Sequence, residues 1–150
     1  CFPFLYYNMK TTLLRPFHFA FPVKDIEETK KWYTQTLGCS IGRESDSWVD
    51  FNFFGHQISA HQVDKELLSD HTNIVDGHNI PSRHFGAVLT IDQWEHLNKH
   101  FTKNKIQFLI KPTIRFKGEI GEQATMFIRD PSGNVLEFKA FQNDNMIFKK

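Results

Sequence analysis

The sequence has little cysteine and no spacing typical of a zinc knuckle. Its 150 residues include two cysteines, Cys1 and Cys39, and neither forms a C-x-x-C pair. This usage argues against a disulfide scaffold and against a structural zinc site. Because sparse and unpaired cysteine suits a reducing compartment, we expect a cytoplasmic protein.

The chain also lacks a long apolar run and an excess of charge of one sign. No stretch has the length of a transmembrane helix, and the apolar start has no basic region before it, as a signal peptide would. Eighteen Lys and Arg residues against 17 Asp and Glu give a net charge of +1, without a basic run that could follow a nucleic-acid backbone. We therefore expect no membrane partner and no nucleic-acid partner, and a small molecule as the ligand.

Motifs of several common enzyme classes are missing as well. There is no G-x-G-x-x-G motif, no phosphate-binding loop and no Ser-His-Asp arrangement, which argues against nucleotide-dependent enzymes and triad hydrolases. What the chain does have is apolar material, with 40% hydrophobic residues and 16 Phe. This composition predicts an ordered core, and the length fits one domain or two small repeated modules.

Two copies of one order of elements follow each other along the chain. In the first copy, residues 17–23 alternate as a strand, and Asp25 begins a helix that Gly38 ends. In the second copy, residues 84–91 form the strand and Asp92 begins the helix. Three further strands follow each helix, at 40–44, 48–54 and 57–63 in the first copy and at 107–110, 124–129 and 135–141 in the second. Each copy therefore has the order βαβββ, and the chain is an internal repeat.

This repeat predicts an α+β fold in which two βαβββ modules form a curved mixed sheet or a barrel around a metal site. The predicted parts are an N-terminal extension, a first module, a linker loop, a second module and a C-terminal tail, at residues 1–15, 16–63, 64–83, 84–142 and 143–150. Because residue 1 is not Met and Met9 precedes the first strand pattern, we expect residues 1–8 to lie outside the domain proper.

Three side chains that bind metals in many proteins lie on the strand faces that do not carry the Phe rows. His18 and His84 occupy equivalent positions on the first strand of each module, and alternation turns Glu137 of the last strand inward. An inward carboxylate needs a partner, and two imidazoles with one carboxylate form the facial set that holds a divalent metal. The alternative is that these are ordinary surface or hydrogen-bonded histidines, since the chain has eight, but their symmetric placement favours the metal site.

These features, together with the closing segment Asp130-Pro-Ser-Gly-Asn-Val-Leu-Glu-Phe138, resemble the vicinal oxygen chelate superfamily over about residues 16–142. That superfamily includes glyoxalase I, extradiol dioxygenases, and fosfomycin and bleomycin resistance proteins. Residues 55–61 and 115–126 resemble, more narrowly, a bacterial group of predicted extradiol-type dioxygenases. The resemblance implies that His18, His84 and Glu137 bind the metal and that a substrate binds it through two adjacent oxygens.

One position departs from the pattern of glyoxalase I. In that enzyme a fourth protein ligand comes from the last strand of the first module, whereas aligning Gly55 with Gly133 puts Ser59 there, and Ser is a poor ligand. Three ligands with open coordination positions favour Fe(II) or Mn(II), with Ni or Zn possible for isomerisation or addition.

Five more residues are candidates for the site. His61 lies two residues after Ser59 on the same predicted face, where it could act as a general acid or base, although a strand-end His in solvent is the alternative. The candidates for substrate binding are Asp50 and Asn52, on one face of their strand, and Arg115 and Lys117, which could hold a carboxylate or phosphate or be solvated hairpin charges.

The expected function is therefore that of a metal-dependent enzyme that chelates vicinal oxygens, closest to an extradiol dioxygenase. Open alternatives are a glyoxalase-type isomerase, a resistance thiol transferase, and a non-catalytic protein of the same fold that sequesters a ligand. The two modules can close a barrel within one chain or exchange across a two-fold dimer, and both arrangements unite the same three ligands. Because closed dimers are common among small homo-oligomers, we expect a homodimer.

Overall fold

A computed structural model describes residues 14–64, 72–75, 77–81 and 83–149 of the chain. The first module forms a four-stranded mixed sheet with the strand order β1-β4-β3-β2, in which β1 and β4 are parallel and the other neighbours antiparallel. Its elements are β1 (His18–Val23), α2 (Ile26–Leu37), β2 (Ser40–Glu44), β3 (Trp48–Phe53) and β4 (His56–Gln62).

The second module repeats this plan with the order β7-β10-β9-β8, again with its first and last strands parallel. Its elements are β7 (Phe85–Leu89), α3 (Ile91–Lys103), β8 (Phe108–Arg115), β9 (Gln123–Arg129) and β10 (Val135–Phe141). The predicted α+β repeat is confirmed. The two sheets, as far as the structure describes them, do not close into a barrel.

The ends of the helices follow local capping. Asp25 caps α2, because its carboxylate accepts the N–H of Glu28, and Gly38 ends the helix in the left-handed region at φ 68°. The prediction of Asp92 as the second cap was wrong. Thr90 caps α3, since its hydroxyl accepts the N–H of Gln93 while the Gln93 side chain accepts the N–H of Thr90.

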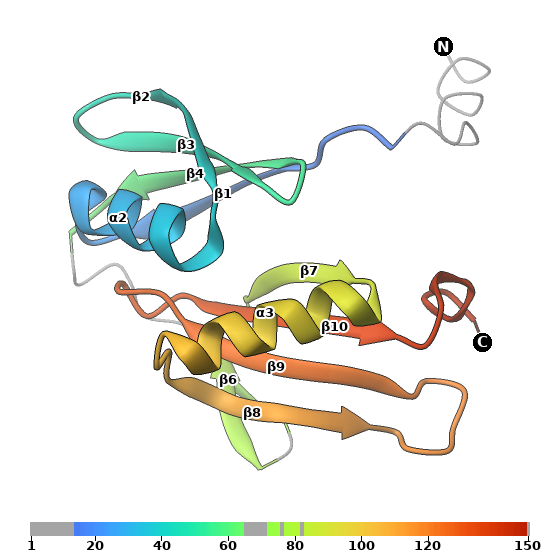
Figure 1. The fold of residues 1–150 in the computed structure, drawn as a ribbon. Helices are drawn as coiled ribbons and strands as arrows, with labels where there is room; N and C mark the ends of the chain where they lie inside the picture. Colours follow the sequence, from blue (N-terminus) through green and yellow to red (C-terminus); the bar gives the residue numbers. More distant parts are fainter. Residues whose placement is uncertain (1–13, 65–71, 76, 82, 150) are drawn as a thin grey trace.

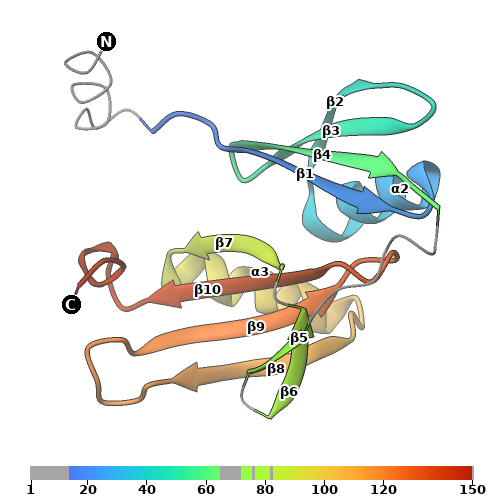
Figure 2. The same ribbon diagram turned by 180° about the vertical axis from the view of Figure 1, so that it is seen from behind.

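The stretch between the modules contains regular structure. Within residues 64–83, β5 (Thr72–Val75) and β6 (His78–Pro81) form a two-stranded antiparallel sheet. Ile80 of β6 is buried against Ile110, Phe127 and Val135 of the second sheet. The hairpin therefore covers part of the face of this sheet that α3 leaves open (Figure 2). A short 3-10 helix, Asp144–Met146, lies in the C-terminal tail, and residues 1–8 lie outside the described part.

Both helices lie on the same side of the two sheets, in front of the strands in Figure 1 and behind them in Figure 2. An aromatic core joins the modules, with ring centroids 5.0 Å apart for Phe21 and Phe85 and 6.3 Å apart for Phe53 and Phe138. The opposite faces of the strands are open over much of their length, since Ala20, Pro22 and Gly86 are exposed. No helix in the described part of the chain is long and apolar enough to span a membrane.

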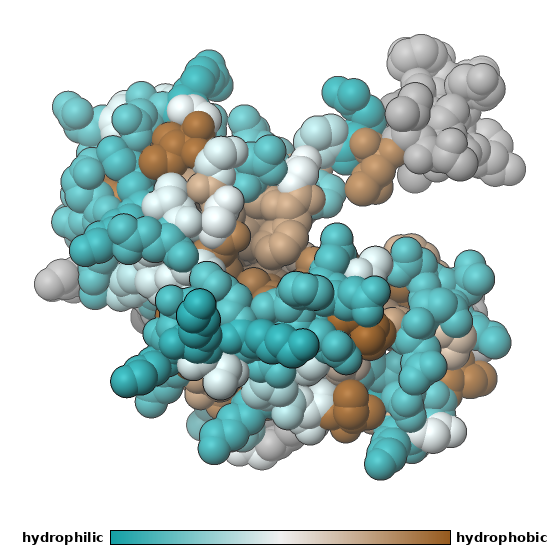
Figure 3. All heavy atoms as spheres, in the orientation of Figure 1, coloured by the Kyte–Doolittle hydropathy of each residue, from teal (hydrophilic) through white to brown (hydrophobic). Residues whose placement is uncertain are grey.

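A cavity of about 610 Å³ lies on the helix side between the modules, where apolar surface is visible in the hollow of Figure 3. Leu37, Phe54 and Leu97 contribute to its lining. None of the residues predicted for the site lines this cavity. The candidate chemistry therefore belongs to the other side of the sheets.

A buried hydrogen bond ties α2 to the turn between β9 and β10. The hydroxyl of Tyr33, which is fully buried, donates to Asp130 Oδ2 at 3.1 Å. Burial raises the pKa of the Asp130 carboxyl, although hydrogen bonds from Asn134, Tyr33 and Ser132 oppose that shift. The ionised Asp130 carboxylate is therefore stabilised by these hydrogen-bond donors against the effect of burial.

Tyr33→Phe is expected to lower the free energy of unfolding by about 1–2 kcal/mol, because it removes one donor from a buried acceptor and leaves the ring packing in place. Urea denaturation measures the change, and Lys31→Gln on the exposed face of α2 is the matched control. An unchanged midpoint for Tyr33→Phe would mean that this bond does not stabilise the junction between the modules.

Candidate metal and substrate site

His84 and Glu137 meet on the open face of the second sheet. The register of β7 against β10 places Gly86 beside Glu137, and His84 lies two residues before Gly86. The distance from His84 Nε2 to Glu137 Oε2 is 3.4 Å. The other carboxylate oxygen, Oε1, accepts a hydrogen bond of 2.9 Å from the Thr125 hydroxyl. Lys139 Nζ lies 3.7 Å from Oε2, so three side chains hold the carboxylate in place.

Gly86 is required by the approach of β7 to β10 at this point. A Cβ atom placed on Gly86 would overlap the backbone carbonyl of Glu137. Any side chain at this position would therefore displace the strand that carries Glu137.

The surroundings of Glu137 favour its ionised form. Burial acts to raise the pKa of the carboxyl, but the hydrogen bond with His84 and the charge of Lys139, together with the Thr125 hydroxyl, outweigh burial and hold the pKa below its ordinary value. The group is therefore an anion at neutral pH, which is the form that binds a metal.

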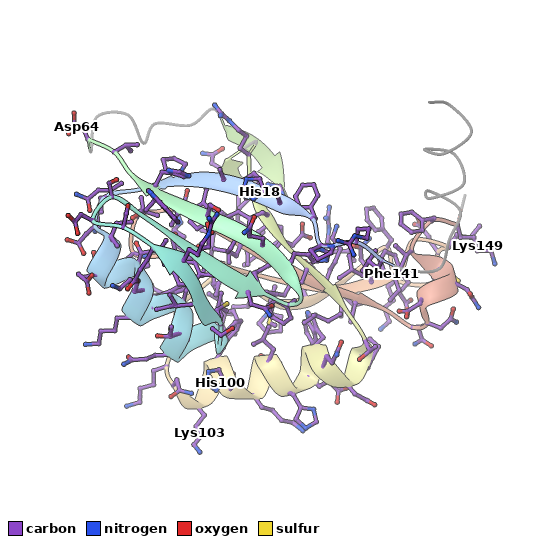
Figure 4. The ribbon with its side chains drawn as sticks, turned by 90° about the horizontal axis from the view of Figure 1, so that it is seen from above. His18, Asp64, His100, Lys103, Phe141 and Lys149 are labelled. Carbon is purple, nitrogen blue, oxygen red and sulfur yellow. The ribbon has the colours of Figure 1, made fainter. Side chains whose placement is uncertain are left out.

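His18 lies on the open face of the first sheet, where it is exposed (Figure 4). Its Nδ1 is 2.8 Å from Oε1 of Gln57, the residue opposite it on β4. Because this amide oxygen only accepts, the contact favours the hydrogen on Nδ1, and in the neutral imidazole Nε2 is then the atom with the lone pair. The hydrogen-bond network continues inward, since Gln57 Nε2 donates to Asp50 at 3.4 Å and Ser59 Oγ donates to the same carboxylate at 2.5 Å.

The structure brings two of the three predicted metal ligands together and leaves the third apart. Among the described residues no group of three His, Cys, Asp or Glu side chains is placed to hold one metal ion. His84 and Glu137 are paired, whereas His18 is on the other sheet with its own partner. Within the described part of the chain, His18 therefore does not join His84 and Glu137 in one group.

The remaining candidates lie at several places on the open side. Asp50 is buried and Asn52 exposed, and both line a cavity of about 360 Å³, although Asn52 also accepts the N–H of Gly55 in the turn. His61 is exposed on β4 opposite Trp48, on the same face as Ser59. The register thus agrees with the face expected for His61.

Arg115 and Lys117 do not lie together. Arg115 ends β8 opposite Gln123, with its guanidinium 5.0 Å from the centre of the Phe116 ring. Lys117 is exposed in the turn that follows. Only Arg115 is thus placed on a strand of the open face.

The sequence interpretation did not identify two residues that contact the predicted ligands. Lys139 lies two residues after Glu137, so the strand alternation that placed Glu137 could also have identified it. Gln57 contacts His18 only through the pairing of β1 with β4, which are 39 residues apart at this point. Alternation within one strand carries no information on such a pairing.

Comparison with known protein families agrees with this fold. Residues 15–138 match the family model of the Glyoxalase/Bleomycin resistance protein/Dioxygenase superfamily. Since the match covers most of the chain, the protein belongs to this superfamily. No curated protein matched the chain.

Solved structures with the same fold carry names that point to different functions. A glyoxalase/bleomycin resistance protein/dioxygenase from Alicyclobacillus acidocaldarius is 33% identical, with a TM-score of 0.72 over 89% of this chain and 96% of that one. The fosfomycin resistance protein FosX from Listeria monocytogenes is 12% identical, with a TM-score of 0.65 over 90% and 98%. Lactoylglutathione lyase from Agrobacterium tumefaciens is 14% identical, with a TM-score of 0.59 over 88% and 97%. The last two are similar in fold alone.

Proposed function

We propose that this protein is a metal-dependent enzyme that binds a small substrate through two adjacent oxygens, with His84 and Glu137 of one chain and His18 of a second copy as metal ligands. The observation that carries the proposal is the pair of His84 and Glu137, 3.4 Å apart on an open sheet face. His18 occupies the equivalent position of the other module, also on an open face.

The residues present fit a divalent ion. Two ligand atoms 3.4 Å apart can both reach one ion at bond lengths of about 2.0–2.3 Å. Thr125 and Gln57 fix the orientation of Glu137 and His18, as outer hydrogen bonds commonly do for metal ligands.

A second copy is needed because both open faces lie on the side opposite the helices. In a two-fold dimer, the first sheet of one copy can face the second sheet of the other. Such an exchange would place His18 of one copy over His84 and Glu137 of its partner and would form two identical sites. The same exchange would cover the exposed strand residues Ala20, Pro22 and Val88.

Among the activities of the superfamily, we favour an extradiol-dioxygenase-like reaction with Fe(II) or Mn(II). Ser59 stands where glyoxalase I has its fourth protein ligand, and the nearby Asp50 is held by Ser59 and Gln57. Three protein ligands leave open positions, where the bound ion would supply Lewis acidity and oxygen activation. His61, exposed on the same face as His18, is our candidate for moving a proton to or from the substrate.

The deciding experiment is elemental analysis of protein purified without a metal-binding tag, followed by loading with Fe(II), Mn(II), Ni(II) or Zn(II). We expect one divalent ion per chain and oxygen consumption with a catechol by the Fe(II) or Mn(II) protein. Isomerisation of a hemithioacetal by the Ni(II) or Zn(II) protein would instead identify a glyoxalase-type enzyme. A protein that binds no divalent ion would contradict the proposal and favour a ligand-sequestering role.

Gln57→Leu is expected to weaken metal binding about tenfold, because His18 would lose the acceptor that fixes its Nδ1 hydrogen. Competition titration with a chromophoric chelator measures the affinity. Gln35→Leu, an exposed change on α2, is the matched control. Equal affinities of the two variants would show that Gln57 does not orient a ligand.

A further inference from the structure

A chain of hydrogen bonds links His18 to a buried carboxylate on the first sheet. Gln57 lies opposite His18 on β4. Asp50 is the diagonal neighbour of Gln57 on β3, because its register partner Ser59 follows Gln57 by two residues. The side-chain oxygen of Gln57 is 2.8 Å from His18 Nδ1, and Gln57 Nε2 donates to Asp50 Oδ2 at 3.4 Å. One amide therefore connects the imidazole with the carboxylate.

Asp50 is buried, and both of its oxygens have neutral donors. The residue is 7% exposed. The Ser59 hydroxyl donates to Oδ1 at 2.5 Å, and the Gln57 amide donates to Oδ2. Arg43 Nε comes within 4.0 Å of Oδ2, but the Arg43 side chain is 85% exposed, so solvent screens this charge. A buried carboxylate loses much of its hydration, and these two donors replace it.

The carboxylate decides which way the Gln57 amide faces. An amide has one end that accepts hydrogen bonds and one end that donates them, whereas a carboxylate only accepts. If the Gln57 amide turned over, its oxygen would face Asp50, and a buried acceptor would lose its donor. The amide therefore keeps its NH2 group toward Asp50 and its oxygen toward His18. This oxygen favours the hydrogen on His18 Nδ1.

The two modules differ in how their histidines contact a carboxylate. In the second module Glu137 lies directly beside His84, with 3.4 Å between Oε2 and Nε2. In the first module the equivalent position holds Ser59, and the carboxylate of Asp50 is one strand further away, on β3. The Gln57 amide spans this distance.

We propose that Asp50 is a positioning residue of the metal site rather than a group that binds substrate. Through the Gln57 amide it holds neutral His18 in the form that has the hydrogen on Nδ1 and the lone pair on Nε2. The arrangement extends by one residue the carboxylate–histidine pair that commonly orients a metal ligand. The inference rests on the proposed function for the role of His18 as a ligand, but the position of the hydrogen can be measured without a metal.

The test is the position of the hydrogen on neutral His18 in the metal-free protein. Long-range proton–nitrogen NMR correlation of isotope-labelled protein distinguishes the two neutral forms, and the spectrum of His18→Ala assigns the signal. We expect the Nδ1–H form to predominate in the wild-type protein. In Asp50→Leu the ratio of the Nδ1–H form to the Nε2–H form should fall about tenfold, because the Gln57 amide can then turn over.

Ser59→Ala is the matched control, since it removes the other donor of Asp50 and leaves the contact with Gln57 in place. It should keep the wild-type ratio. An unchanged ratio in folded Asp50→Leu, or an equal fall in Ser59→Ala, would overturn the inference. If Asp50→Leu does not fold, the wild-type protein decides: a predominant Nε2–H form overturns the inference, and a predominant Nδ1–H form supports it.

Metal affinity is the second measurement and connects this network to the proposed function. Asp50→Leu should weaken the binding of Mn(II) about fivefold, and the same change made in Gln57→Leu should have no further effect, since Asp50 acts through Gln57. Additive losses would overturn the route through Gln57. A wild-type protein that shows the Asp50-dependent Nδ1–H form but binds no divalent ion would contradict the proposed function and leave the positioning of His18 supported.

Discussion

Glu137→Gln is expected to lower the affinity for a divalent ion at least about tenfold, the largest loss for a single change on the second sheet. The amide keeps the length of the side chain and an oxygen that can accept from Thr125, but it removes the negative charge that faces His84. A neutral amide is a much weaker ligand for a first-row metal than a carboxylate. Elemental analysis after dialysis measures the loss directly.

Lys99→Gln is the control for this prediction, since Lys99 is exposed on α3 and far from the open faces. It should retain the metal content of the wild-type protein. Equal metal content in both variants would remove Glu137 from the site, and with it the geometric basis of the proposed function.

Much of the second sheet could be predicted from the sequence because its signals are local. The strand predicted at 135–141 has the observed bounds of β10, since its alternation is uninterrupted and a turn with Pro and Gly precedes it. The inward face of Glu137 follows from the same alternation. The start of α3 was misplaced because Thr90 and Asp92 are both good caps, and the choice between them depends on where β7 ends, at Leu89.

The linker between the modules shows a second limit of prediction from the sequence. Residues 64–83 are largely polar, so composition alone predicts a loop. The hairpin of β5 and β6 nevertheless forms there, and one buried side chain, Ile80, packs against the second sheet. A single apolar anchor within a polar stretch gives no periodic pattern that would identify it.

The relative placement of the modules could not be predicted at all. The Phe rows face the helix side whether the modules close within one chain or exchange with a partner, so their periodicity is the same in both cases. What distinguishes the arrangements is the contact between modules, such as that of Phe21 with Phe85 on the helix side. This contact leaves His18 apart from His84 and Glu137, which alternation within a strand cannot reveal.

His18→Ala and Glu137→Ala proteins, each expected to have lost the metal site, should recover metal binding when they are unfolded and refolded together. In an exchanged dimer the site combines His18 of one copy with His84 and Glu137 of the other. A heterodimer of the two variants therefore has one intact site and one site without either ligand. With random pairing, half of the dimers are heterodimers, so the mixture should bind about one quarter of the metal of the wild-type protein.

Each variant refolded alone is the control, because a homodimer of either one has two broken sites and should bind no more metal after refolding than before. If the mixture also fails to recover metal, the sites are formed within one chain. Metal retained by the His18→Ala protein alone would show that His18 is not a ligand. Sedimentation of the wild-type protein as a monomer would contradict the exchanged dimer directly. Recovery near one quarter requires that His18 and Glu137 come from different copies, because chains that each lack one ligand cannot regain the complete set by themselves.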